Sequence, residues 1–325
     1  MSHKEVLYLT EGEVGQCMKP KDAVILAEKG IKADGNSLVA GDKFYMDVGE
    51  SGFIKPFSGY LAGEEYAYVK SFSFFENNLD KSLPVTDSMV LLFHAETGLP
   101  ACIMEANWIT TMKTGASTAV TAKYLATPDS KVLTIFGTGG QGRTHLLCIN
   151  ELFDLDQVWA IDVIPGVAEQ FVEEMRKETG LNIDIPASNE VAVRESDLIV
   201  TVTTGSSVNV EHAWVKPGAF IARMGSYQEI SHELLLKADK LIVDRWEYAS
   251  YRVPEMVDLI NEGRLSRSDI YAEWPRIAAG LTPGRESNDE IILYMGLGIW
   301  GEYAAILPEV YRRAQELGLG LRLGR

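Results

Sequence analysis

The sequence predicts an α/β fold in which a doubly wound parallel sheet is joined to a smaller α/β domain with a sheet of its own. From residue 132 onward, short apolar runs alternate with helical segments, as in successive β-α-β units. Earlier in the chain, turns separate the apolar runs instead. The 325 residues, 46% of them hydrophobic, suffice for about two domains with sizeable cores.

The parallel sheet is expected within residues 119–298. Its predicted strands are residues 132–136, 158–161, 197–202, 219–222 and 240–244. Helical segments fall between them, including residues 167–177 and 254–262. These two segments are followed by Gly180 and Gly263, which is typical of helix C-termini.

The first part of the chain predicts a second sheet. The strand candidates are residues 61–75, 89–94 and 101–104. Thr97 and Gly98 supply a turn between the last two candidates. A helical region is expected over residues 11–32, ending near Gly30 or Gly35.

The C-terminal tail is expected to return to this first domain. Residues 298–317 have a largely helical pattern, although Pro308 should kink or restart the helix. Because the tail follows the last element of the parallel sheet, the N-terminal domain is predicted to be discontinuous. It would consist of residues 1–118 joined by residues 299–325.

Residues 131–142, KVLTIFGTGGQG, form the most informative motif. Residues 132–136 stop at a glycine turn, and residues 144–153 continue at helical spacing, so the glycines lie at a strand-to-helix corner. This context predicts a Rossmann-type dinucleotide site with the diphosphate at the helix N-terminus, the alternative being a glycine-rich loop without a ligand. The expected cofactor contacts in this loop are Gly137, Thr138, Gly139, Gly140, Gln141 and Gly142.

Asp162 predicts which dinucleotide is bound. It ends the next apolar run, about 20 residues beyond the motif, where an acidic residue accepts hydrogen bonds from the adenosine ribose. A carboxylate there repels a 2′-phosphate. The sequence therefore predicts NAD(H) rather than NADP(H).

Composition excludes several classes of function. The formal charge of −16 disfavours binding to nucleic acid or to an anionic membrane surface. There is no apolar run of membrane-spanning length and no apolar leader at the start, and the three cysteines lie far apart, so a reduced, cytoplasmic protein is expected. Without a CxxC, HxxxH or GxSxG pattern, neither a metal site nor hydrolysis is predicted.

Several landmarks occur in a family-specific order along nearly the whole chain. They are Lys70 within residues 68–72, residues 91–98, residues 109–116, the glycine loop, residues 284–287 and residues 295–298. The ordered set resembles the ornithine cyclodeaminase, archaeal alanine dehydrogenase and μ-crystallin family. The resemblance implies a homodimer formed through an N-terminal sheet, a Rossmann-type domain, and a substrate site in the cleft between the two domains.

The resemblance also implies roles for three lysines. Lys70 falls on the family lysine that holds the substrate carboxylate and takes part in catalysis. Lys113 falls where the family usually has arginine, and Lys43 falls near an upstream arginine that also meets the carboxylate. Because an ammonium lacks the fork of a guanidinium, we expect looser or shared placement of the carboxylate. The alternatives are a Lys70 that extends to the sheet edge, an exposed Lys113 at a helix start, and a Lys43 in a turn.

Tyr227 marks a departure from the family. Cyclodeaminases and the archaeal alanine dehydrogenase have an aspartate there, assigned to proton transfer at the substrate amine. The Tyr227 phenol is the second catalytic candidate, since it can donate a hydrogen bond to an imine nitrogen; simple packing is the alternative. Further cofactor contacts are expected from Thr114, Thr203, Met224, Gly225 and Leu297.

Together these features predict an NAD(H)-dependent oxidoreductase that reduces a small anionic 2-imino acid or ketimine to an L-amino acid, and runs in reverse as an amino acid dehydrogenase. The candidate substrates are iminosuccinate, iminopropanoate and a cyclic ketimine. Iminosuccinate is among them because the three lysines offer more positive charge than one carboxylate needs. One rival is a cyclodeaminase-type lyase with bound NAD, which releases ammonia without net NADH consumption. The other is a non-catalytic, μ-crystallin-like binding protein.

Overall fold

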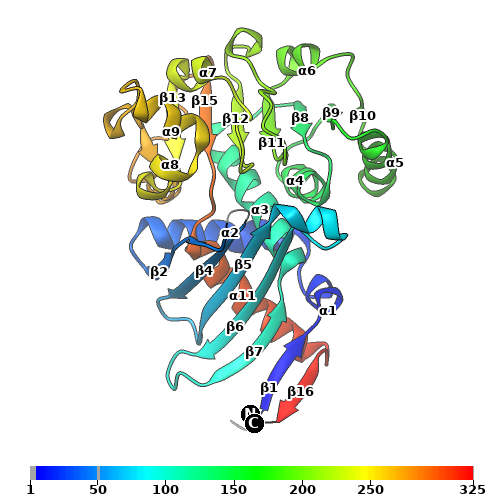
Figure 1. The fold of residues 1–325 in the computed structure, drawn as a ribbon, viewed down its shortest axis with the longest axis vertical. Coiled ribbons are helices and arrows are strands. Elements are labelled where there is room, and N and C mark those ends of the chain that lie inside the picture. The colour runs from blue at the N-terminus through cyan, green and yellow to red at the C-terminus, as the bar shows by residue number, and fades with distance from the viewer. Residues whose placement is uncertain (1–4, 50–51, 325) are drawn as a thin grey trace. The chain divides into compact units, whose positions relative to one another are not determined.

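The computed structural model describes residues 5–49 and 52–324, and the chain forms two compact units (Figure 1). Unit 1 consists of Met1–Lys113 and Ile299–Arg325, and unit 2 of Thr114–Gly298. Their boundary falls inside helix α3 (Asn107–Leu125), whereas the sequence suggested a boundary after residue 118. The start of the chain, from which a cytoplasmic location was expected, lies partly outside the described residues.

Unit 2 contains a sheet in which every neighbouring pair of strands is parallel. Its order is β10-β9-β8-β11-β12-β15-β13-β14. The strands are β8 (Val132–Phe136), β9 (Gln157–Ile161), β10 (Ile183–Asp184), β11 (Leu198–Thr201), β12 (Phe220–Arg223), β13 (Lys240–Val243), β14 (Ala272–Glu273) and β15 (Ile292–Met295). The chain runs outward in both directions from β8, which confirms the predicted doubly wound sheet.

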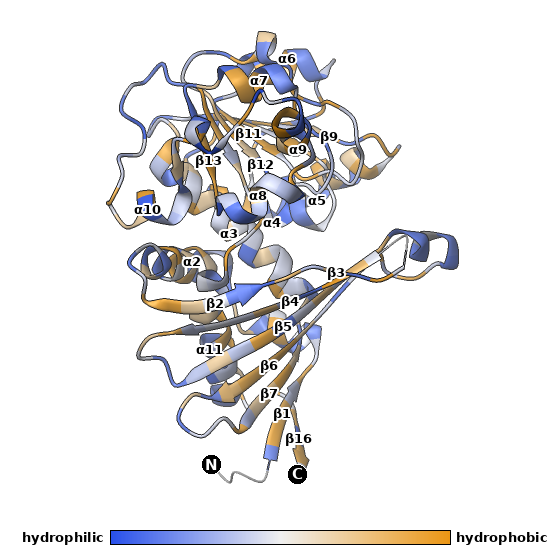
Figure 2. Ribbon diagram, turned by 60° about the vertical axis from the view of Figure 1, so that its left-hand side comes forward, coloured by the Kyte–Doolittle hydropathy of each residue, from blue (hydrophilic) through white to orange (hydrophobic). Residues whose placement is uncertain are grey.

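The central strands of this sheet are buried along their whole length, as expected for a parallel sheet covered on both faces. Figure 2 shows β11 and β13 largely in hydrophobic colours. The helices of the unit are α4 (Gly140–Asn150), α5 (Val167–Thr179), α6 (Asn189–Glu195), α7 (His232–Lys237), α8 (Trp246–Arg252), α9 (Pro254–Asn261) and α10 (Trp274–Ala278).

Unit 1 is built on a mixed sheet with the order β16-β1-β7-β6-β5-β4-β2, and β3 pairs with β4. All of its strand pairs are antiparallel except β1 with β7. The strands are β1 (Glu5–Leu9), β2 (Val39–Lys43), β3 (Met46–Asp47), β4 (Gly52–Leu61), β5 (Tyr66–Phe75), β6 (Thr86–His94), β7 (Pro100–Glu105) and β16 (Leu321–Gly324). The sequence did not predict β1, β2, β3, β4 or β16. Four of these strands are short, and β4 contains two glycines and a proline.

Helices α2 (Pro20–Gly35) and α11 (Trp300–Glu316) pack together, and α11 also contacts β2, β4 and β5; α1 (Glu11–Gln16) contacts β7 (Figure 1). At the crossing of α2 and α11, a Cβ atom on Gly30 would lie 2.2 Å from the carbonyl oxygen of Gly301. The two backbones therefore touch, and only glycine fits.

The helix does not restart at Pro308, because α11 continues through it. Proline removes one helical N–H, but Pro308 and its neighbours Leu307 and Val310 are buried, and this packing holds the helix together. None of the helices in the described part of the chain is long and apolar enough to cross a membrane.

Candidate active site

The glycine loop connects β8 to α4 in unit 2. Gly137 has a φ of +93°, a conformation that favours glycine, and an added Cβ would lie 2.7 Å from the Val202 carbonyl oxygen after β11. A Cβ on Gly142 would lie 2.4 Å from the Gly137 carbonyl oxygen. Both positions therefore need glycine so that the loop can turn and α4 can pack against β8.

The other side of this loop is open. A Cβ on Gly139 or Gly140 would meet no atom within 4 Å, and the N-cap residue of α4, Gly139, has no side chain that could cap the helix. The buried Oε1 atom of Gln141 has no hydrogen-bond partner among the described residues. Uncapped N–H groups suit a diphosphate, and an unused acceptor suits a ribose hydroxyl, so the loop fits a dinucleotide.

Asp162 follows β9, directly beside the loop. Its Oδ2 atom accepts hydrogen bonds from the Thr138 N–H at 2.9 Å and the Thr138 hydroxyl at 3.2 Å, and its Oδ1 accepts from the Ile164 N–H at 3.0 Å. A carboxylate has about four acceptor positions, so capacity remains for a ribose hydroxyl. These bonds orient the carboxylate and hold the loop in place.

Thr203 and Gly225 follow β11 and β12, and a residue that the sequence did not single out, Glu229, joins them. Glu229 accepts from the N–H and the hydroxyl of Thr203, both at 2.7 Å. It also accepts from the Gly225 N–H at 2.9 Å and the Thr201 hydroxyl at 2.8 Å. Because these bonds connect the carboxyl ends of adjacent parallel strands, they shape the edge of the sheet where ligands of this fold bind.

Arg223 completes a fully buried charge cluster with Glu229 and Glu255, which we call the arginine–glutamate cluster. Its guanidinium lies 3.1 Å from a Glu255 carboxylate oxygen and 4.0 Å from Glu229. It donates to the carbonyl oxygens of Gly225 at 2.6 Å and Tyr227 at 2.5 Å. Burial raises the pKa of Glu229, while Arg223 opposes that shift. The cluster thus fixes the backbone that carries the half-buried Tyr227. A charged residue within the apolar strand β12 was the signal in the sequence.

The remaining predicted cofactor residues either follow strands of this sheet or lie in α3. Met224 directly follows β12. The Leu297 N–H donates to Asp244 at 2.6 Å, and Asp244 follows β13. Thr114 is the first residue of α3 that belongs to unit 2, and its carbonyl accepts from the Thr118 hydroxyl at 3.2 Å.

A buried histidine lies behind the glycine loop. His145 has one ring nitrogen 3.0 Å from the Thr118 hydroxyl and the other 2.7 Å from the Gln141 carbonyl oxygen. Burial lowers the pKa of His145 to about 4. A neutral His145 therefore connects α3 to the first turn of α4.

Four lysines gather on one face of the unit 1 sheet or beside it. Lys43 and Lys70 each pair with Phe57 across adjacent strands, and Lys55 pairs with Phe72. Residues opposite one another in antiparallel strands share a face, so these three side chains lie on the same side of β2, β4 and β5. Lys113 comes from α3. We call these four residues the lysine cluster; the sequence prediction missed Lys55.

Lys70 is the most deeply buried member, with 1% of its surface exposed. Its ammonium donates to the Ser88 hydroxyl at 3.2 Å and lies over the rings of Phe57, Phe72 and Tyr303. Within residues 5–49 and 52–324, no carboxylate forms an ion pair with it. Burial, followed by repulsion from Lys55 and Lys113, lowers its pKa well below the usual value. Lys70 therefore does not extend to solvent at the sheet edge.

The other lysines differ in their surroundings. Lys113 forms an ion pair with Glu302 and lies 4.9 Å from the centre of the Tyr303 ring. Lys43 lies 5.5 Å from the centre of the Phe57 ring. Lys113 is buried rather than exposed at a helix start, and Lys43 is buried at the end of strand β2 rather than placed in a turn.

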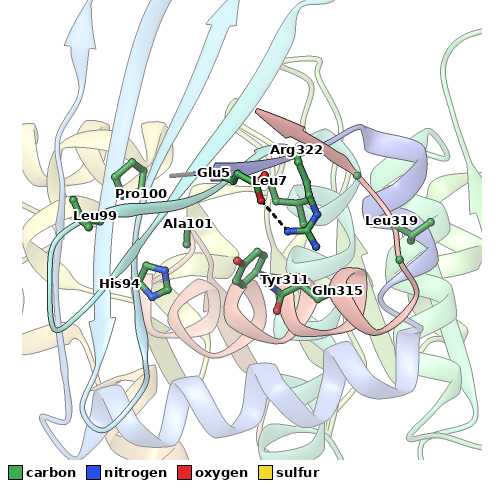
Figure 3. Close-up of a pocket in the computed structure, with 12 residues that line it drawn as sticks. Glu5, Leu7, His94, Leu99, Pro100, Ala101, Tyr311, Gln315, Leu319 and Arg322 are labelled. Carbon is green, nitrogen blue, oxygen red and sulfur yellow. Dashed lines mark hydrogen bonds and ion pairs between the residues drawn. The ribbon is translucent and has the colours of Figure 1, made fainter. Parts of the chain in front are cut away.

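A separate cavity of about 240 Å³ lies elsewhere in unit 1 (Figure 3). Tyr311, Gln315 and His94 line it, with an ion pair between Arg322 and Glu5 at its rim. None of the predicted site residues lines this cavity. Across the described ranges, no group of three or more His, Cys, Asp and Glu side chains is arranged to hold a metal ion.

Comparison with known proteins identifies the family. The sequence profile of the Ornithine cyclodeaminase/mu-crystallin family matches residues 10–318. The alanine dehydrogenase of Archaeoglobus fulgidus is 30% identical over 325 residues, or 98% of each chain.

Two solved structures are similar over nearly the whole chain. The Delta(1)-pyrroline-2-carboxylate reductase of Thermococcus litoralis, in complex with NADH and L-proline, has a TM-score of 0.93 and 31% identity, covering 98% of this chain and all (100%) of that one. An archaeal alanine dehydrogenase dimer with bound NAD has a TM-score of 0.91 and 29% identity, covering 98% and 99%. The chain therefore belongs to the ornithine cyclodeaminase/mu-crystallin family.

Proposed function

We propose that the protein is an NAD(H)-dependent oxidoreductase that reduces a small 2-imino acid or ketimine to the L-amino acid and catalyses the reverse oxidation. The observation that carries this proposal is the buried ammonium of Lys70, which has aromatic neighbours and no carboxylate partner in the part of the chain that the structure describes. A buried charge of this kind is costly unless an anion compensates it. A substrate carboxylate is such an anion.

Relatives support the reaction class. The similar proteins are a reductase of a cyclic imino acid, solved with NADH and L-proline, and alanine dehydrogenases, one of them solved with NAD. In this chain, the open glycine loop and Asp162 are suited to hold NAD(H). Iminopropanoate, iminosuccinate and a cyclic ketimine are the candidate substrates.

The roles of the residues follow from the reaction. Reduction of a C=N bond adds a hydride to carbon and a proton to nitrogen, and NADH supplies the hydride when it is bound. Lys70 holds the carboxylate, and burial, followed by repulsion from Lys55 and Lys113, lowers its pKa well below the usual value, which makes its ammonium a better proton donor. Tyr227, on a backbone held by Arg223, donates a hydrogen bond to the imine nitrogen or to the far end of the substrate.

Cofactor preference tests the role of Asp162. We expect a higher kcat/KM with NADH than with NADPH, because the carboxylate repels a 2′-phosphate. Asp162→Ser should reduce this preference by about tenfold, and steady-state kinetics with both cofactors measures it. Equal use of NADPH by the unaltered protein would contradict the assignment.

We also propose a homodimer formed through the unit 1 sheet. Val69 and Leu91 pair on the face opposite Lys70 and are 41% and 37% exposed. Light scattering should give the mass of a dimer at micromolar concentration, and Val69→Glu should shift it toward the monomer. The cysteines Cys17, Cys102 and Cys148 are free and buried, which supports a reducing, cytoplasmic location.

An activity screen tests the proposal directly. The protein is mixed with NADH, ammonia and either pyruvate or oxaloacetate, or with a preformed cyclic ketimine, and loss of NADH absorbance is followed. NADH oxidation that depends on the imine supports the proposal. Ammonia release from a diamino acid without net NADH consumption would indicate a lyase. Dinucleotide binding with no turnover would indicate a binding protein.

A further inference from the structure

Thr138, in the glycine loop, is bonded to two side chains of opposite charge. Its N–H and hydroxyl donate to the Asp162 carboxylate at 2.9 and 3.2 Å. Its carbonyl oxygen accepts a hydrogen bond from the Arg143 guanidinium at 2.5 Å. Arg143 lies near the start of α4, directly after the last glycine of the loop. A carboxylate and a guanidinium therefore contact the same residue of the cofactor loop.

The Arg143 guanidinium is also engaged by a second carboxylate, from α5. Its Nε and Nη2 atoms donate to Glu174 Oε2 at 2.9 and 2.5 Å. Its central carbon lies 5.6 Å from the centre of the Phe171 ring, and α5, which carries both partners, packs against α4 (Figure 1). Hydrogen bonds from Arg143, followed by one from Gln170, lower the pKa of Glu174, so the pair is charged at neutral pH.

This ion pair lies at the surface, where it can be separated. The exposed fractions of the Arg143 and Glu174 side chains are 25% and 45%. Water screens such a pair, so the arginine can turn to another anion when its partner is removed. Without Glu174, the guanidinium would remain beside Thr138 with a fork of donors that suits a phosphate group.

The place of this arginine matters for the choice of cofactor. In dinucleotide-binding folds, the acidic residue after the second strand accepts hydrogen bonds from the adenosine ribose, and an arginine nearby accommodates a 2′-phosphate. This chain has both kinds of residue on one loop position, Asp162 and Arg143. Asp162 repels a phosphate, and Glu174 occupies the cation that would attract it.

We propose that Glu174 is a second specificity-determining residue for the cofactor: it keeps the Arg143 guanidinium engaged, so that this group does not bind the 2′-phosphate of NADP(H). This inference rests on the proposed function, whose cofactor site it extends to α5. It implies that the two acidic residues act together. Removal of Asp162 alone leaves an arginine that is still paired.

The test measures the affinities for NADH and NADPH by fluorescence titration, because the two dinucleotides differ only in the 2′-phosphate. The unaltered protein should prefer NADH, and Asp162→Ser should reduce that preference by about tenfold. Adding Glu174→Ala to Asp162→Ser should tighten NADPH binding by about a further threefold to tenfold. Adding Arg143→Met to this double variant should remove the further gain.

Glu173→Ala is the matched control, because it removes an exposed carboxylate from the neighbouring position of α5. In the Asp162→Ser background it should leave NADPH affinity within about twofold. High salt should reduce the gain from Glu174→Ala, since that gain is an attraction between charges. Two results would overturn the inference: a gain from Glu174→Ala no larger than that from Glu173→Ala, or a gain that persists after Arg143→Met.

These titrations need no turnover, so this inference and the proposed reaction can fail separately. If the affinities follow the expected pattern but no imine is reduced, imine reduction fails and the role of Glu174 stands. If imines are reduced with NADH but Glu174→Ala brings no gain, the role of Glu174 fails alone. If the unaltered protein binds neither dinucleotide, both fail.

Discussion

The two units each bury a charged cluster, and the clusters are opposite in design. In unit 2, Arg223 lies between two carboxylates, and Glu229 accepts four hydrogen bonds from its surroundings. In unit 1, Lys70 has one neutral hydroxyl partner, and burial, followed by repulsion from Lys55 and Lys113, lowers its pKa. The first cluster is complete and fixes the backbone. In the second, Lys113 pairs with Glu302 but Lys70 forms no ion pair among the described residues, and we infer that a ligand supplies an anion for Lys70.

The largest effect is expected from breaking the arginine–glutamate cluster. Arg223→Met leaves Glu229 and Glu255 buried without their cation, so the free energy of unfolding should fall by about 3–5 kcal/mol. Chemical denaturation measures this loss. As a control, Arg223→Met combined with Glu255→Gln should recover part of the stability. A fall below about 1 kcal/mol would show that this cluster does not stabilise unit 2.

Lys70→Met, unlike Arg223→Met, should lower activity without lowering stability. It removes the charge that we propose holds the substrate carboxylate, so kcat/KM should fall by about 100-fold or more, or roughly 3 kcal/mol of transition-state stabilisation. NADH affinity, measured by fluorescence titration, should change little. The unfolding midpoint should stay the same or rise, because an uncompensated buried charge is replaced by an apolar side chain. Equal losses of turnover and cofactor affinity would make Lys70 a structural residue.

Lys113→Met should give an intermediate result, because Lys113 already has a carboxylate partner. Its removal leaves the buried Glu302 carboxylate without its cation, and we expect a loss of about 2 kcal/mol in the free energy of unfolding. The double variant with Glu302→Gln should be more stable than Lys113→Met alone. The loss of kcat/KM should be smaller than for Lys70→Met. A loss as large as that of Lys70→Met would show that Lys113 carries the carboxylate.

The smallest expected effect is a pH dependence of the free energy of unfolding that is caused by the lowered pKa of Lys70. Its folded-state pKa lies well below the 10.5 of a free lysine. Between these two values the unfolded chain binds a proton that the folded chain does not, so the free energy of unfolding rises with pH across this window. Below the lowered pKa, the cost of burying the charged form is fully present. Denaturation of ligand-free protein over neutral to alkaline pH should show this rise in the unaltered protein relative to Lys70→Met, and parallel curves would contradict it.

Local patterns predicted unit 2 better than unit 1. The glycine loop and the strands around it follow from short stretches of sequence, because a parallel sheet covered on both faces needs continuous apolar runs. In unit 1, β2 and β16 are short strands without such a run, and β1 has only the short run of residues 6–9; all three lie at or next to an edge of the sheet and depend on pairing with other segments. Pro308 is a related case, since burial of α11 outweighs the local tendency of proline to break a helix.

In the candidate site, too, some residues could be predicted from the local sequence and others could not. Lys43, Lys70 and Lys113 were predictable from residue type and order, whereas Lys55 was not, because its position depends on the register between β4 and β5. The partners Glu302 and Glu255 are also invisible locally. Each lies far along the chain from the cation it meets, in a helix whose sequence alone gives the carboxylate no partner.

By itself, the sequence determined the fold class, the dinucleotide loop with its acidic partner, and the family, because these depend on neighbouring residues or on an ordered set of motifs. Only the tertiary structure decided which buried charges are compensated. The energy of an ammonium depends on the atoms within a few ångströms of it, and those atoms come from separate strands and helices. Lys70 and Lys113 are alike as residues, yet Glu302 neutralises one, while the other lies among aromatic rings.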